Sequence, residues 1–263
     1  MSEFGIDVVR GAEGITWLCL RNPGKLNAVR HEMWQALPET VARLDADPEV
    51  RVLIVRGAGE EAFASGADIS EFQTHRKDAA SAAAYERTSA RAFEALVAFE
   101  KPMLAMLQGV CVGGGLAIAA CADLRIAADD TRLALPPARL GLGYHFAGIR
   151  RIVSLVGPSI AAEIVFTART YNAEEALRIG LVNQVVAKED LEPFTVRYAS
   201  HIAENAPLTL RAAKRAIGET LRDPGERDLE AVQRMIAACF ESADYAEGVR
   251  AFLEKRKPVF RGR

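Results

Sequence analysis

The segment that most constrains the fold is residues 111–127, which read CVGGGLAIAACADLRIA. Three consecutive glycines end an apolar stretch, a run of small residues follows, and the strand-like LRIA comes next. A strand, a glycine turn, a short helix and a second strand form the repeating unit of α/β proteins. No acidic residue occurs between the glycines and Asp123. The segment therefore predicts an α/β fold with an uncharged helix behind a glycine turn.

The same pattern of strands, turns and helices recurs along the chain. Alternating residues at 6–10 and 14–22 predict strands, and the consecutive apolar residues of RVLIVRG and MLAMLQG predict buried strands. Between them, Asn27 is expected to cap a helix, and Pro38 is expected to kink or restart that helix. From Phe194 onward the patterns are amphipathic and helical. We predict an α/β core over residues 1–193 and a helical segment over 194–263 that forms an oligomer surface.

Composition narrows the class of partner. With 33 basic and 35 acidic residues the formal net charge is -2, which gives no field for collecting nucleic acid or anionic membrane. The four cysteines lack the spacing of zinc ligands or disulfide frameworks and suit a reducing compartment. Because no basic-apolar leader and no apolar run of about 18 residues is present, we expect a cytoplasmic protein that binds a small molecule or its own copies.

A second glycine turn lies in FASGADISEF, residues 63–72. Asp68 and Glu71 have the spacing of a capping box, so a helix is expected to start there, with the amides near Ala67 pointing outward. Two such helix starts side by side supply convergent backbone donors, which form an oxyanion hole. The alternative is that both glycine turns serve only tight packing of helix on sheet. The motifs GxGxxG, GxxxxGK[ST] and GxSxG are not completed anywhere in the chain.

These residues resemble the enoyl-CoA hydratase/isomerase superfamily, the crotonases. The matching segments appear in family order and cover nearly the whole chain: NPGKLNAV, FASGADI, GVCVGGGLAIAACADLRIA, LPPARLGLG, EALRIGLVNQVV and AEGVRAFLEKRKPVF. The resemblance implies a spiral of ββα units, a helical C-terminal segment that helps form trimers or pairs of trimers, and acyl-CoA substrates. It also implies that the amides of Ala67 and Gly114 form the oxyanion hole.

The departures from the family pattern concern the acids. Family hydratases carry one glutamate three residues after the second oxyanion glycine, where this chain has Ala117, and another after the proline of an LxxPE segment, where it has Pro137. Neither alanine nor proline can transfer a proton. Two-glutamate hydration is therefore not supported by the sequence.

The segment ARLGLGYHFAGIRRI resembles the bacterial methylmalonyl-CoA decarboxylases of the superfamily, in which the tyrosine matching Tyr144 is a site residue. His145 is a further candidate, although alternation predicts that it points away from Tyr144. The alternative for Tyr144 is a buried side chain with a satisfied hydroxyl. One mismatch is that those decarboxylases carry a histidine at the position of Ala67.

The resemblance also implies a binding set for the substrate. Lys25, Leu26 and Ala28 are expected beside the adenosine end of coenzyme A, and Lys255 beside its phosphates, although the basic run from Lys255 can also be only a solvated terminus. The other residues expected to bind the substrate or its coenzyme A moiety are Ser65, Gly66, Asp68, Ile69, Ala117, Pro136 and Pro137, with Ala117 and Pro137 in an apolar pocket. Coenzyme A enters as part of the substrate, and no further cofactor or metal is expected.

These residues support three hypotheses for function. The first is a lyase that forms a thioester enolate by decarboxylating a short substituted malonyl-CoA. The second is a 2-enoyl-CoA hydratase or isomerase that uses another polar group, such as Tyr144, His145 or a loop acid near Glu71. The third is a non-catalytic acyl-CoA binder.

Overall fold

The computed structural model describes residues 4–144 and 146–263, and its main element is a six-stranded sheet. In spatial order the strands are β1 (Gly5–Arg10), β2 (Ile15–Arg21), β3 (Val52–Gly57), β5 (Met103–Leu107), β7 (Leu124–Ala128) and β10 (Gln184–Val186). β1 and β2 pair antiparallel, and every other pairing in this sheet is parallel. The predicted apolar runs thus form the buried parallel strands of the sheet.

A second, four-stranded sheet consists of short strands: β4 (Ala62–Ala64), β6 (Val110–Val112), β8 (Arg132–Ala134) and β9 (Tyr171–Asn172). β3 is followed by β4, β5 by β6, and β7 by β8, so each pair places one strand in each sheet. After each pair the chain enters a helical stretch. This repetition is the spiral of ββα units that the resemblance implied.

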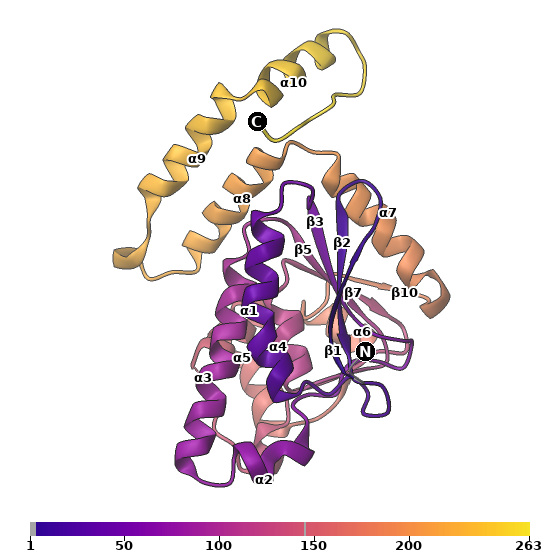
Figure 1. Cartoon of the computed structure of the whole chain (residues 1–263), viewed down its shortest axis with the longest axis vertical. Coiled ribbons are helices and arrows are strands. Elements are labelled where there is room, and N and C mark those ends of the chain that lie inside the picture. Colours follow the sequence, from indigo (N-terminus) through magenta and orange to yellow (C-terminus); the bar gives the residue numbers. More distant parts are fainter. Residues whose placement is uncertain (1–3, 145) are drawn as a thin grey trace.

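Helices cover both faces of the larger sheet (Figure 1). One core cluster joins the first face to α1 (His31–Ala46), α3 (Ala79–Ala98), α4 (Gly114–Cys121) and α5 (Phe146–Thr167). The opposite face packs against α7 (Leu191–Ala203). Within β3, Leu53 and Val55 belong to the first cluster, while Val52 and Ile54 belong to the second. Burial on both faces explains why the strand is continuously apolar.

Helix α4 is enclosed by its neighbours. Seven of its eight residues, Gly115 to Cys121, are buried, and it contacts α3, α5 and β4. A helix that is apolar on every side is one that has no solvent face. The lack of acidic residues after the glycines is therefore what this position in the fold requires.

The C-terminal helices extend away from the sheets (Figure 1). They are α8 (Pro207–Thr220), α9 (Leu229–Glu241) and α10 (Ala243–Leu253), and they confirm three of the predicted amphipathic patterns. An apolar groove of about 720 Å³ runs between them, and Phe240, Phe252 and Leu253 on its wall are exposed. The boundary at residue 193 stays a prediction. Among the described residues, no helix has both the length and the apolar character that crossing a bilayer requires.

Two local predictions concern the segment around the first helix, and the one for Asn27 is wrong. Asn27 does not cap a helix: its backbone has φ 56°, and its side-chain amide donates to the carbonyls of Ala58 and Ala62. Helix α1 begins at His31 instead and runs to Ala46 with Pro38 inside it. The proline therefore does not restart the helix, and a kink there stays a prediction.

The capping box at Asp68 and Glu71 is also not formed. Asp68 caps only a 3-10 turn (Ile69–Glu71), accepting from the amide of Ser70, before the short helix α2 (Phe72–His75). Glu71 reaches α1, where it accepts a hydrogen bond from the amide of His31 at 2.8 Å. Its carboxylate therefore satisfies an amide in the first turn of a different helix, which local spacing does not reveal.

Candidate active site

The first feature of the site is the backbone amide of Ala67. Gly66, with φ 108°, turns the chain into a bridge with Val29. In that bridge the amide of Val29 donates to the carbonyl of Gly66 at 2.7 Å, and the amide of Asp68 donates to the carbonyl of Val29 at 3.0 Å. Because these bonds use the groups on either side of it, the amide of Ala67 is directed away from the bridge.

The second feature is the amide of Gly114, the first residue of α4. Gly113, with φ 55°, makes the turn from β6, and its amide donates to the carbonyl of Ala134 at 2.9 Å. A methyl group added to Gly114 would lie 3.6 Å from the amide nitrogen of Ala67. Within residues 4–144 and 146–263, neither of these two amides donates to another group of the chain. Two unused donors thus lie side by side at the glycine turns.

Trp34 of α1 packs against this pair. The added methyl group on Gly114 would approach its ring atom Cζ2 to 3.1 Å. The indole nitrogen of Trp34 donates to the hydroxyl of Tyr85 at 2.8 Å, and both side chains are buried. A rigid aromatic wall therefore supports the amide of Gly114.

The two positions where family hydratases carry acids are apolar and buried. Ala117 lies one helical turn after Gly114, and its amide donates to the carbonyl of Gly113 at 3.0 Å. Pro137 begins a 3-10 turn (Pro137–Leu140) directly after Pro136. Their side chains hold no proton to exchange, so each of the two positions holds a buried apolar residue, and their place in the substrate site stays a prediction.

Tyr144 is half-buried and packs against the first core cluster, which includes Ala117's neighbours Leu116 and Ile118. Burial raises the pKa of its hydroxyl well above the ordinary tyrosine value, and the nearby Cys121 acts in the same direction. Since a methyl group on Gly148 would approach ring atom Cε1 to 2.6 Å, the first turn of α5 holds the ring in place. Tyr144 is thus a neutral hydrogen-bond donor at neutral pH. His145 lies outside the described residues.

A pocket of about 410 Å³ opens beside Tyr144, and its wall consists of Phe72, Arg76, Ala82, Glu86, Leu142, Gly143 and Tyr144. Arg76 and Glu86 form an ion pair across 3.3 Å. Neither of these two residues was predicted from the sequence. In an amphipathic helix such as α3, a glutamate that faces a pocket has the same pattern as one that faces solvent.

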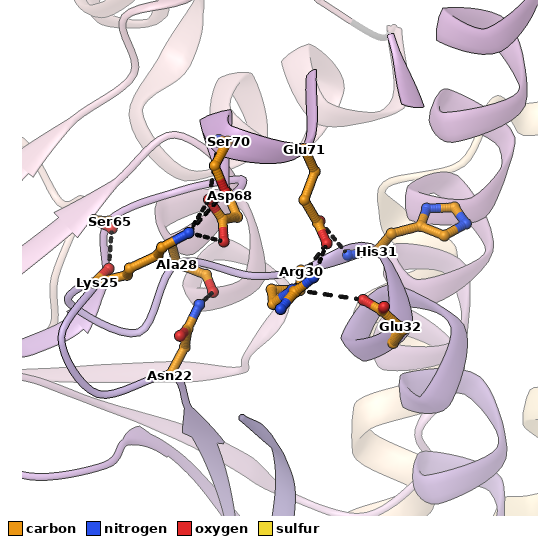
Figure 2. A network of polar contacts seen from close by, with 10 residues as sticks. All are labelled: Asn22, Lys25, Ala28, Arg30, His31, Glu32, Ser65, Asp68, Ser70 and Glu71. Atoms are coloured by element: carbon orange, nitrogen blue, oxygen red, sulfur yellow. Dashed lines mark hydrogen bonds and ion pairs between the residues drawn. The ribbon is translucent and has the colours of Figure 1, made fainter. Parts of the chain in front are cut away.

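The predicted binding residues near the chain start gather in one place (Figure 2). Lys25 Nζ donates to Asp68 Oδ2 at 2.9 Å and to Ser70 Oγ at 2.7 Å. Burial raises the pKa of Asp68, but the hydrogen bonds from Ser70 and Lys25 outweigh it and hold the pKa below its usual range. The Ser65 hydroxyl donates to the carbonyl of Lys25, and its amide donates to that of Leu26.

The same loop presents apolar surface. Leu26 and Ile69 are exposed, whereas Ala28 is buried and its carbonyl accepts from Asn22 at 2.8 Å. Lys255, by contrast, follows the end of α10, which Figure 1 places at the opposite end of the molecule from α2. The structure thus brings Lys25, Leu26, Ser65 and Asp68 together but leaves Lys255 apart from them within one chain.

Glu71 ties this region to α1. Its buried carboxylate accepts from Arg30 Nε and from the amide of His31, each at 2.8 Å (Figure 2). The turn that carries Asp68 is therefore fixed to the start of the helix that carries Trp34. The turn next to the amide of Ala67 and the helix whose Trp34 packs against Gly114 are thus held together as one unit.

Paired sheets of ββα units with helical C-terminal elements define the crotonase fold, a class of enzymes. The sequence pattern of the enoyl-CoA hydratase/isomerase family matches residues 10–263. The chain therefore belongs to the enoyl-CoA hydratase/isomerase superfamily.

Relatives and solved structures agree with this assignment. The chain is 34% identical to a crotonyl-CoA hydratase of Syntrophomonas wolfei, covering 96% of each chain. It is 36% identical to the methylmalonyl-CoA decarboxylase of Escherichia coli, covering 90% of this chain and 91% of the relative. A crystal structure of an enoyl-CoA hydratase/carnithine racemase from Magnetospirillum magneticum superimposes with a TM-score of 0.94 at 36% identity, covering 100% and 97%.

Proposed function

We propose that this protein is an acyl-CoA lyase that decarboxylates a short substituted malonyl-CoA through a thioester enolate. The observation that carries the proposal is the pairing of two unused amides, those of Ala67 and Gly114, with apolar residues at both acid positions, Ala117 and Pro137. Such a site stabilises an oxyanion but offers no carboxylate there to activate water. The decarboxylase among the relatives supports the same choice.

The reaction balances without a protein base. The bond between the α carbon and the carboxylate carbon breaks, and its electron pair moves onto the thioester, whose carbonyl oxygen becomes the enolate oxygen. Carbon dioxide leaves, and the α carbon then takes a proton. The amides of Ala67 and Gly114 donate to the enolate oxygen, while the apolar walls at Ala117 and Pro137 remove water from the departing carboxylate.

Tyr144 is assigned the polar role in this site. Its hydroxyl donates to the carboxylate before it leaves, or supplies the proton that the α carbon takes. Support comes from its packing against the first core cluster, from its closeness to Cys121 of α4, and from the raised pKa of its hydroxyl, which keeps the proton on the oxygen. A proton donor of this kind needs a partner that becomes more basic during the reaction, as the enolate carbon does.

We assign the coenzyme A moiety to the loop around Lys25. The exposed Lys25 ammonium, held by Asp68 and Ser70, offers charge to a phosphate, and the exposed Leu26 and Ile69 offer apolar contact to an adenine ring. Each assignment uses ordinary recognition of phosphate by lysine and of aromatic surface by apolar side chains.

We assign the apolar groove of α8, α9 and α10 to a second copy of this chain, in a trimer or a pair of trimers. Exposed aromatic residues such as Phe240 and Phe252 line this groove, although a monomer rarely leaves so much contiguous apolar surface in water. In such an assembly Lys255 from a neighbouring copy is available to coenzyme A phosphates.

The test is turnover of methylmalonyl-CoA in heavy water, followed by mass spectrometry of the thioester. The proposal predicts propionyl-CoA with one deuterium at the α carbon. Release of no carbon dioxide, with the thioester bound and unchanged, would make the chain a non-catalytic binder and refute the proposal.

A second candidate, hydration of a 2-enoyl-CoA, is favoured by the carboxylate of Glu86, which lines the same pocket as Tyr144. Relatives named as hydratases add support. In this alternative, Glu86 activates water in place of the missing glutamates. Crotonyl-CoA turnover that is lost in Glu86→Gln would favour the hydratase, whereas no hydration by the unaltered protein would exclude it.

A further inference from the structure

The chain leaves helix α10 through a turn whose backbone is strained. The amide of Arg256 donates to the carbonyl of Ala251 at 3.0 Å. The amide of Lys255 donates to the carbonyl of Phe252 at 3.2 Å. These two hydrogen bonds form a Schellman motif, in which the residue with positive φ is usually glycine. Here that residue is Lys255, with φ 53°. A residue other than glycine is costly in this conformation, and such residues gather at ligand-binding sites.

Glu247, about two turns earlier in α10, holds the chain directly after this turn. Its side chain is 11% exposed, and its carboxylate accepts from Arg256 Nη1 at 2.6 Å and Nη2 at 3.0 Å. It also accepts from the amide of Val259 at 3.1 Å and pairs with Arg250. The hydrogen bonds from Arg256 and Arg250 hold the pKa of this carboxyl well below its usual range, so Glu247 is charged at neutral pH.

A second buried carboxylate of α10 holds the end of the chain. Asp244 accepts from the amide of Arg261 at 2.6 Å and from that of Gly262 at 2.7 Å. The chain after α10 therefore turns back toward the other C-terminal helices (Figure 1). Because Glu247 and Asp244 both hold residues 256–263, a relaxed turn at Lys255 would break hydrogen bonds to buried charged groups, which are expensive to lose.

The side chain of Lys255 is exposed and has no role in this network. Its neighbours Arg256 and Lys257 pair with Glu247 and Glu204. Within the part of the chain that the structure describes, the Lys255 ammonium forms no ion pair. If this position served only to end the helix, glycine would do so without strain. The strained turn thus presents an unpaired ammonium, a group that binds phosphate as a point charge.

We infer that Glu247 is a positioning residue for coenzyme A, because it holds the strained turn from which Lys255 extends its ammonium to a coenzyme A phosphate. The inference rests on the proposed function, which assigns Lys255 to coenzyme A bound by a neighbouring copy. Glu247 itself does not touch the ligand. By charge alone, removing its carboxylate would strengthen the attraction for a phosphate. Weaker binding after its removal is therefore an effect of position.

The experiment measures the dissociation constant of coenzyme A by calorimetry. This ligand carries no acyl group, so the result is independent of whether the protein decarboxylates anything. Lys255→Ala should bind about tenfold more weakly, the worth of about one hydrogen bond to a charged group, and Glu247→Gln about fivefold more weakly. Glu230→Gln, which removes the same charge from a side chain of α9 that is 93% exposed, is the control and should change the affinity less than about twofold.

The double variant separates positioning from a general structural role. In the Lys255→Ala background, Glu247→Gln should weaken binding no further, because the group that it positions is already absent. A further fivefold loss there, or unchanged affinity in Glu247→Gln alone, would overturn the inference and leave the assignment of Lys255 standing. Unchanged affinity in Lys255→Ala would overturn the inference and that assignment together.

Lys255→Gly tests the strain itself. Glycine adopts φ 53° without cost, so this variant should unfold at a higher urea concentration than the unaltered protein. Its affinity for coenzyme A should nevertheless fall as far as that of Lys255→Ala, since both lack the ammonium. A gain in stability together with a loss of binding is the result expected of a strained residue kept for its ligand. A lower unfolding midpoint would show that the turn carries no strain and would also overturn the inference.

Discussion

At the scale of single residues, the proposal depends most on Gly114, because its amide is a proposed donor to the enolate and its lack of a side chain leaves room for a neighbouring ring. Its amide lies beside that of Ala67, and Trp34 occupies the space where a side chain would go. In the proposed reaction, Ala117 and Pro137 determine what happens to the enolate, since they stand where family hydratases carry acids and cannot transfer a proton. Changes at Gly114, at the two apolar walls and at Tyr144 each test a different part of this site.

Gly114→Pro should lower kcat about 10²–10³-fold relative to Gly114→Ala, because both variants place a Cβ against Trp34 but only proline lacks the donor. Proline is well tolerated at the first position of a helix, so α4 should still form. Gly225→Ala, where nothing lies within 4 Å of the added methyl, is the control. Equal rates for the proline and alanine variants, measured by carbon dioxide release, would remove the amide of Gly114 from the mechanism.

The double variant Ala117→Glu with Pro137→Glu should gain hydration of crotonyl-CoA and lose decarboxylation. Two carboxylates restore the acid and base positions and bring water to the apolar walls. The pairing of the changes matters, because one glutamate alone gives charge without a partner for proton transfer. Absorbance of the enoyl thioester reports the first activity. A double variant that decarboxylates at the original rate would show that these positions do not face the reacting carbons.

Tyr144→Phe should lower kcat at least about tenfold while changing KM little, because the hydroxyl acts on the leaving carboxylate or on the enolate carbon. The active form is the protonated one, and burial raises the pKa of this group. The rate of the unaltered protein should therefore stay level as pH rises through about 10, where an ordinary tyrosine ionises. A loss of rate centred near that value would indicate an unperturbed phenol.

At the scale of elements, the turn after Gly66 and the start of α1 act as one unit through Glu71. Its carboxylate accepts from Arg30 and from the amide of His31, and the next turn of α1 carries Trp34. Support for the amides of Ala67 and Gly114 therefore passes through a buried charge rather than through sequence neighbours.

Glu71→Ala should lower the free energy of unfolding by about 2 kcal/mol, since hydrogen bonds to charged groups contribute about 1.5–3 kcal/mol and the amide of His31 loses its acceptor. The control is Glu32→Ala, an exposed carboxylate 3.7 Å from the same Arg30, which should cost less than about 0.5 kcal/mol. Urea unfolding gives both values. Equal losses would show that burial of Glu71 adds nothing.

The elements also show how far the fold could be predicted from the sequence. β3, β5 and β7 are apolar and flanked by glycine or loop residues, so their sequence pattern was sufficient to predict them as strands. β4, β6, β8 and β9 have only two or three residues, too few for a periodicity to appear. Asn27 and Glu71 were misassigned because their partners lie about 31–41 residues away in the chain.

In the candidate site, too, some residues could be predicted from the sequence and others could not. The two glycine turns were predicted because glycine turns are local signals, and the resemblance assigned the amides of Ala67 and Gly114 within them. The structure places these two residues together. Arg76 and Glu86 were missed because their significance depends on Tyr144, which comes from a segment more than fifty residues later and meets them only in the folded chain. Residues that are far apart in the chain and meet only after folding have no fixed spacing, so one sequence cannot reveal that they lie together.

At the scale of the whole molecule, the sheets form a self-contained core, whereas α8, α9 and α10 expose apolar side chains. Phe252→Glu combined with Phe240→Glu should convert the proposed trimer or pair of trimers to monomers, because burying two unpaired carboxylates is costly. Light scattering after size-exclusion chromatography gives the mass. Phe166→Glu, an exposed phenylalanine of α5 outside the groove, is the control. A monomeric unaltered protein would contradict the assigned occupant.

The most direct test of the central claim is mass spectrometry of a mixed pool of malonyl-type and 2-enoyl thioesters of coenzyme A after incubation with the purified protein. The account predicts that one malonyl-type member loses carbon dioxide and that the enoyl members stay unchanged. Addition of water to an enoyl member, with every malonyl-type member intact, would contradict it and make Glu86 the first residue to examine as the base.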